Sequence, residues 1–159
     1  MNTFDLFQQQ YQFNRGRTLD LLDRIEQMQE PQAALAWRPG PGRAHVGWQL
    51  LHIGITEELF AAERLAKKDG RFHELWERFR GGSTPDDAIP PLEQIRDVLA
   101  STREDLLVTL REQDEAMLDE FAWEARDGRR LTLRATLQII GWHEAHHHGQ
   151  AHLTLNLYK

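Results

Sequence analysis

The 159-residue sequence contains no cysteine, and this absence removes several kinds of chemistry at once. Disulfide bonds, zinc sites built from thiolates and cysteine nucleophiles are all excluded. Any metal ion that the chain binds must therefore be held by histidine, carboxylate or water. Histidine is well represented, with 8 in the chain, and five of these fall within residues 143–152.

Long apolar runs are also missing, so we expect no transmembrane helix. The first residues, MNTFDLFQQQYQF, lack the basic start and the apolar stretch of a secretory signal peptide. The 19 basic and 25 acidic residues give a net charge of −6, which argues against nucleic acid or an anionic membrane as the main partner. We therefore expect a cytoplasmic protein that binds neither nucleic acid nor membrane.

Four segments show the three- and four-residue spacing of apolar residues that is typical of amphipathic helices. They cover residues 3–30, 45–68 and 91–112, and a last segment that Thr132 is expected to cap. Four amphipathic helices of this length bury their apolar stripes most simply as a bundle. We predict one all-α domain, residues 1–159, built as a four-helix bundle.

The connections between these helices differ in character. EPQAALAWRPGPGRAH contains three prolines and two glycines, which predicts a loop between the first two helices. One short extra helix is expected near residues 73–80, in the connection between the second and third helices. The connection before the last helix has a turn at Asp127-Gly128, which favours a short hairpin-like excursion.

The histidines at the C-terminal end divide into two groups by their position on the helix. His143 and His147 are four residues apart on the apolar stripe, so both imidazoles face the core. His52 lies on the core stripe of the second helix, where an aliphatic residue would otherwise be expected. Neutral imidazoles that share one face direct their lone pairs the same way, as a divalent metal requires. We predict that these three histidines form a metal site with an open position for water or substrate.

The other histidines at or near these helices are not expected to bind the same ion. His146, His148 and His152 lie off the apolar stripe and have no predicted role. His45 precedes His52 by seven residues, about 10 Å along a helix, which is too far for both to share one ion easily. We expect His45 to cap the second helix or to line the mouth of a pocket.

Two other motifs overlap the cluster. Residues 143–147 match H-E-x-x-H, which would make Glu144 the general base of a zinc protease. However, Gly149 and His152 each fall one residue early for the extended motif, and no strand precedes it to hold a peptide. Glu144-x-x-His147 also matches half of a di-iron motif, but the chain has no second copy. A further alternative is a core hydrogen-bond network of histidines without metal.

Two segments, PGPGRAHVGWQLLHIGITEELF and IIGWHEAHHHGQAHLTLNLYK, resemble the DinB/YfiT-like superfamily of metal-binding four-helix bundles. The resemblance covers nearly the whole chain. In that family a His-x-x-x-His pair runs into a His-Arg-Gly-Gln-like end, and here His148 stands where arginine is common. The resemblance implies that His52, His143 and His147 hold one divalent ion, Zn, Ni, Fe or Mn. It also implies a thiol-dependent transferase or isomerase that uses a low-molecular-weight thiol, or a hydrolase.

Few further residues are candidates for catalysis. Glu144 adjoins a predicted ligand but is rotated by about 100° from it, so it is a candidate base or orienting group. Glu57 lies off the face of the second helix that carries His52, and it is expected to pair with a neighbouring helix. Asn14 and Thr18 face inward from the first helix, where they can contact substrate or bound water.

A non-catalytic metal-binding protein, or a stress-related interaction scaffold, is the alternative function. The absence of a fourth strong protein ligand near the three histidines favours the enzyme, because structural sites close that position. Trp76 and Trp123 are expected to be exposed and would then mark a dimer face. We therefore expect a homodimer that acts on a small molecule.

Overall fold

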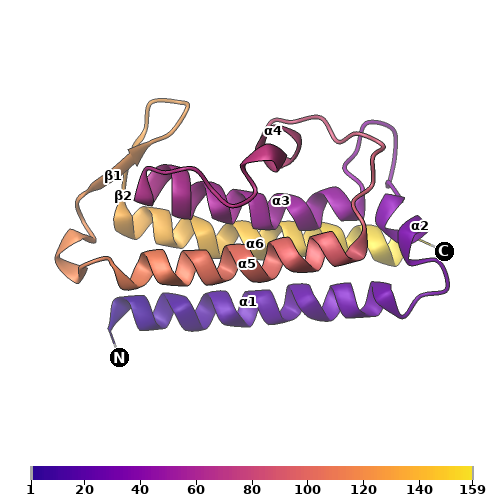
Figure 1. The fold of residues 1–159 in the computed structure, drawn as a ribbon, viewed down its shortest axis with the longest axis horizontal. Helices are drawn as coiled ribbons and strands as arrows, with labels where there is room; N and C mark the ends of the chain where they lie inside the picture. Colours follow the sequence, from indigo (N-terminus) through magenta and orange to yellow (C-terminus); the bar gives the residue numbers. More distant parts are fainter. Residues whose placement is uncertain (1, 159) are drawn as a thin grey trace.

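Four long helices lie side by side along the length of the molecule (Figure 1) in a computed structural model that describes residues 2–158. They are α1 (Thr3–Glu26), α3 (Val46–Glu58), α5 (Leu92–Arg111) and α6 (Leu133–Leu157). Helix α3 packs against α5 and α6, and α1 closes the bundle against the same two helices. The predicted all-α four-helix bundle is confirmed. None of the helices in the described residues combines the length and apolarity that crossing a membrane requires.

The second predicted helix is not uniform along its length. Its α-helical part ends at Glu58, and the chain continues as a π-helix, Leu59–Ala66 (η1). Lys67 ends this segment with a left-handed φ of 54°. The wider turns of a π-helix are frequent at functional sites, and this one follows His52 closely in the chain.

The connections confirm one prediction and correct another. A 3-10 turn, His73–Leu75 (η2), leads into the short helix α4 (Trp76–Phe79) between α3 and α5, as expected. The prediction of a loop was wrong for α2 (Pro31–Ala36), because Pro31 occupies the first helical position, where it costs no hydrogen bond.

The connection between α5 and α6 contains a 3-10 turn and a small hairpin. The turn is Glu115–Met117 (η3), and the hairpin pairs β1 (Phe121–Glu124) with β2 (Arg130–Thr132) in antiparallel register. Gly128 lies in the hairpin turn with a φ of 82°, a conformation that favours glycine. Thr132 caps α6, as predicted, because its side chain accepts a hydrogen bond from the Ala135 N–H.

The apolar core forms two clusters along the bundle, with a charged layer between them. On α1, for example, Tyr11 belongs to one cluster and Leu21 to the other, and the buried Arg15 falls between them. On α5, Arg103 falls in the same way between Leu99 and Leu106. On α6 a buried charged residue likewise separates the two apolar clusters. Each of these three helices therefore contributes one buried charged residue to the layer between the clusters.

His45 caps α3, which confirms one of its two predicted roles. Its Nδ1 accepts a hydrogen bond from the Trp48 N–H at 2.9 Å, and its Nε2–H donates to the Asp86 carbonyl at 3.1 Å. Burial and the neighbouring Arg38 hold the pKa of His45 below its ordinary value of 6.5. The cap therefore depends on the neutral form of the ring.

Replacing His45 with alanine is expected to lower the free energy of unfolding of the metal-free protein by about 1 kcal/mol at pH 7.5. Because the folded-state pKa of His45 is depressed, its contribution is complete above pH 6.5 and is lost as the pH falls below it. Urea denaturation at several pH values should show the difference from wild type shrinking towards pH 5. His45→Asn keeps an acceptor that cannot titrate, so it should retain most of the stability and flatten the pH dependence. A difference that grows at pH 5 would contradict the neutral cap.

Candidate metal centre

The three predicted histidines meet between α3 and α6. One ligand nitrogen from each of His52, His143 and His147 lies within 4.8 Å of the other two. The Nε2 atoms of His52 and His143 are 3.0 Å apart, and the ring centroids of the three imidazoles are 4.3–4.8 Å apart. The i, i+4 spacing on α6 and the single position on α3 thus bring together residues 91 positions apart in the chain.

Hydrogen bonds determine which ring nitrogen of His52 and of His147 is unprotonated and can bind a metal. The His52 Nδ1 lies 2.6 Å from the carbonyl oxygen of Phe79, which can only accept, so this nitrogen carries the proton. The His147 Nδ1 lies 2.7 Å from the side-chain oxygen of Gln49 and donates in the same way. Both rings therefore present an unprotonated Nε2. The ring of His52 is also stacked on Trp48, with centroids 4.5 Å apart.

All three histidines are neutral at physiological pH. Burial, followed by the neighbouring His52 and His147, lowers the pKa of His143 to about 2. Burial and His52 lower the pKa of His147 to about 3, and burial lowers the pKa of His52. Neutral imidazole is the form that binds metals, so the site needs no deprotonation before an ion enters.

This arrangement is compatible with a divalent ion. Two imidazoles bound to one ion at about 2.0–2.1 Å place their nitrogens roughly 3–3.4 Å apart, close to the observed 3.0 Å between His52 and His143. Each ring that donates from Nδ1 to an oxygen has the partner that typically orients a metal-bound histidine. Within the described residues no acid or fourth histidine joins the group, so one or more positions would stay open.

The histidines that lie off the stripe do not reach this group. His146 is exposed, stacks on Trp142 and pairs with Gln150 at 2.8 Å. The rings of His148 and His152 are tilted against one another, with centroids 5.8 Å apart, beside α1. His146 occupies a variable position of the H-E-x-x-H motif and does not join the group, whereas His143 and His147, the two histidines of that motif, both do.

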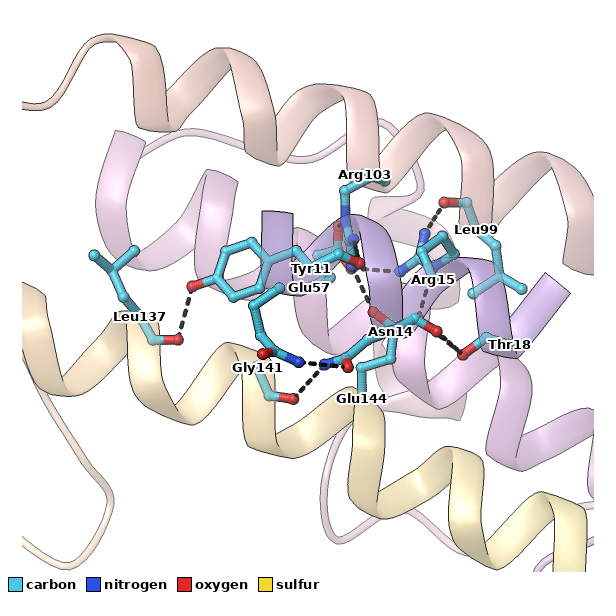
Figure 2. A network of polar contacts seen from close by, with 11 residues as sticks. Tyr11, Asn14, Arg15, Thr18, Glu57, Leu99, Arg103, Leu137, Gly141 and Glu144 are labelled. Atoms are coloured by element: carbon cyan, nitrogen blue, oxygen red, sulfur yellow. Dashed lines mark hydrogen bonds and ion pairs between the residues drawn. The ribbon is translucent and has the colours of Figure 1, made fainter. Parts of the chain in front are cut away.

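Glu144 belongs to a buried ion-pair network that links α6 to α1, α3 and α5 (Figure 2). One carboxylate oxygen accepts from the Arg15 Nε at 2.7 Å and from the Thr18 hydroxyl at 2.9 Å, and the other accepts from Arg103. Glu57 on α3 binds both arginines, which confirms that it pairs with neighbouring helices. Because its oxygens are occupied away from the histidines, Glu144 serves the fold here, and its predicted role as a base has no geometric support.

Two arginines, which were not predicted from the sequence, complete this network. Burial alone would raise the pKa of Glu57, but Arg15 and Arg103 hold it below its ordinary value. Arg103 binds Glu57 through two nitrogens, at 2.6 and 2.9 Å, and also donates to the Tyr11 carbonyl. Their positions did contain a signal, since each arginine lies four residues after a core residue.

The remaining candidate residues from the sequence lie outside the histidine group. Asn14 and Thr18 face inward, as expected, but they contact α6 through the Gly141 carbonyl and Glu144 rather than the histidines. Trp76 is buried and donates its indole N–H to Glu58 at 2.6 Å, so the prediction that it is exposed was wrong. Trp123 is half-buried and donates to Thr136. Neither tryptophan forms an exposed dimer face, and the homodimer stays an untested prediction.

A cavity of about 490 Å³ opens directly beside the three histidines. This volume lies in the range of small-molecule sites, roughly 300–1,000 Å³. One wall is apolar and is formed by Leu59, Phe60, Trp123 and Ile139. The π-helix, the segment after α4 and the β-hairpin all contribute to the wall, and no sequence pattern placed these segments together.

Comparisons with known proteins agree with this architecture. The family model described as the DinB superfamily matches residues 10–151. A similar fold occurs in the crystal structure of a "conserved protein of locus from Enterococcus faecalis", at 20% identity and a TM-score of 0.79, over 99% of this chain and 97% of that chain. At this identity the likeness shows the fold alone. No curated protein matches the sequence significantly.

Proposed function

Because the chain belongs to the DinB superfamily, we propose that it is a metal-dependent enzyme whose single divalent ion is held by His52, His143 and His147. The observation that supports this most directly is the cavity, since the three imidazoles form part of its wall. A purely structural site would be closed by a fourth protein ligand and would need no cavity. The ion is Zn, Ni, Fe or Mn, since imidazole suits several of these metals.

The reaction class that we propose is transfer or isomerisation with a low-molecular-weight thiol, or hydrolysis. A divalent ion in this site would act as a Lewis acid and lower the pKa of a thiol or water that reaches it. The protein itself fixes the ligands through the Phe79 carbonyl and the Gln49 side chain. Phe60 and Trp123 offer an apolar surface that would orient the substrate and exclude water.

We expect untagged protein to contain close to one divalent ion per chain, measured by elemental analysis. The tag must be removed because its own histidines bind metal. Chelation should abolish turnover in a screen of thiol-transfer and hydrolysis reactions, and one of the four metals should restore it. The triple variant H52A/H143A/H147A serves as the metal-free control in every assay.

Two results would overturn this proposal. One is a protein that takes up no metal even after reconstitution. The other is turnover that survives complete chelation or persists in the triple variant. Metal bound at full occupancy without turnover in the screen would favour the non-catalytic metal-binding alternative.

A further inference from the structure

The cavity beside the three histidines has a second chemical character, because three arginines line it and no acidic residue of the described chain does. Arg64 comes from the π-helix, Arg80 follows α4, and Arg126 lies in the turn of the β-hairpin. Three separate segments thus direct positive charge at one cavity. Glu63 and Glu124 lie nearby, in an adjoining groove that the same arginines border from the other side.

Arg64 is held in a fixed position. Its guanidinium carbon lies 4.1 Å from the ring centroid of Phe60 and 4.1 Å from that of Trp123, so the two aromatic rings flank it. Burial lowers the pKa of Arg64 to about 10; the charge of Glu63 raises it, and the charges of Arg80 and Arg126 lower it. The group stays positively charged at neutral pH. Like charges that line one cavity repel, and an anion between them would offset that repulsion.

Arg80 and Arg126 have unused hydrogen-bonding capacity. The Arg80 Nε is buried and has no hydrogen-bond partner, although its Nη1 donates to the exposed Glu77 at 3.0 Å. Buried donors in native proteins are nearly always paired, so an unpaired guanidinium nitrogen at a cavity indicates an absent acceptor. Arg126 takes part in no hydrogen bond or ion pair within residues 2–158.

We propose that this cavity binds a small organic anion, with its carboxylate or phosphoryl group held by Arg80 and Arg126 beside Arg64. The apolar part of the molecule would lie against Phe60 and Trp123, with its other end at the three histidines. Guanidinium groups recognise both carboxylates and phosphates through paired hydrogen bonds, so the chemistry of the site specifies the charge and not the source. The inference rests on the proposed function only for what happens at the histidine end.

Isothermal titration calorimetry measures the binding of three probes to metal-free and to zinc-loaded protein at low ionic strength. The probes are succinate, inorganic phosphate and the neutral succinamide. We expect saturable binding of succinate or phosphate, weakened roughly tenfold or more by Arg80→Ala and by Arg126→Ala. Arg80→Lys should retain part of the affinity. Arg111→Ala removes one positive charge from the exposed end of α5, away from the cavity, and should leave binding unchanged.

The two anions separate the possible sources, since succinate alone would indicate a carboxylate substrate and phosphate alone a phosphorylated one. Equal binding of succinamide, arginine variants that bind like wild type, or no saturable binding of either anion would each overturn the inference. Metal content measured on the same samples separates the two proposals. Arginine-dependent binding without metal uptake would leave this inference standing and remove the metalloenzyme, whereas full metal occupancy without arginine dependence would do the reverse. Matched thermal melting temperatures of the variants establish that each is folded.

Discussion

Arg103→Met is expected to lower the free energy of unfolding by about 3–5 kcal/mol, because it leaves two buried carboxylates with one arginine between them. Arg15, Glu57, Arg103 and Glu144 form a network of two positive and two negative charges, and each side chain is less than one-tenth exposed. Removing one cation leaves an uncompensated negative charge in the core. The melting temperature should fall by roughly 6–20 °C for a chain of this length.

The matched control is Arg96→Met on the same helix. Arg96 also binds two carboxylates, Asp23 and Glu26, but all three side chains are at least one-third exposed. Solvent screens these exposed ion pairs, so their loss should lower the free energy of unfolding by less than about 1 kcal/mol. The charge-balanced double variant Arg103→Met/Glu144→Gln should cost less than the sum of its two single substitutions. Equal losses for Arg103→Met and Arg96→Met would show that the network does not stabilise the fold.

The pH dependence of this effect has a defined sign. In the wild type the pKa of Glu57 is depressed in the folded state, so its contribution to stability is present at neutral pH and is lost as the pH falls. In Arg103→Met the unpaired carboxylate would instead take up a proton and be less costly to bury. The difference in unfolding free energy between wild type and variant should therefore narrow from pH 7 towards pH 4.

The network also links the two helices that carry His52, His143 and His147. Glu57 follows His52 by five residues on α3, and Glu144 adjoins His143 on α6, so both ligand-bearing helices are tied to Arg15 and Arg103 (Figure 2). Charged hydrogen bonds have strict geometry and fix the rotation of one helix against another. The charged layer thus aligns His52 with the histidines of α6, and loss of stability in Arg103→Met should be accompanied by weaker metal binding.

The histidine group could be predicted from the sequence because it depends only on helical periodicity. Two imidazoles at i, i+4 on an apolar stripe must share a face, and His52 stood on the stripe of another helix. Arg15 and Arg103 occupy equivalent stripe positions, but an isolated arginine is ordinarily a surface residue, and its partners lie 41 to 129 residues away. Ion pairs between residues so far apart in the sequence can be recognised only once the packing of the helices is known.

The residues that line the cavity could not be predicted from the sequence in this way. Arg64, Arg80 and Arg126 come from a π-helix, an irregular connection and a hairpin turn. None of these segments has the regular spacing that predicts which side chains share a face. The π-helix itself was predicted as a continuation of the α-helix, since the apolar pattern is too short to distinguish the two. Residues whose direction depends on irregular backbone therefore required the three-dimensional structure.

Single substitution of His52, His143 or His147 by alanine is expected to weaken metal binding by about 10²–10³-fold. Structural zinc sites with four ligands bind with roughly 10–16 kcal/mol, so one ligand contributes about 2.5–4 kcal/mol. Competition with a chromophoric chelator measures this loss directly. Metal at a hundred times its dissociation constant should also raise the free energy of unfolding of the wild type by about 2.7 kcal/mol, and the three variants should lose that gain.

The neighbouring histidines provide controls on the same helix. His146→Ala and His152→Ala each remove an imidazole from α6 that lies outside the group, so both should keep wild-type metal affinity. His146 lies at a variable position of the H-E-x-x-H motif, whose two histidines are His143 and His147, so neither motif requires it as a ligand. Loss of metal in His146→Ala, with retention in His147→Ala, would therefore overturn the assignment of ligands. Equal loss of stability in all three ligand variants under chelation would instead show that the imidazoles contribute to the fold without an ion.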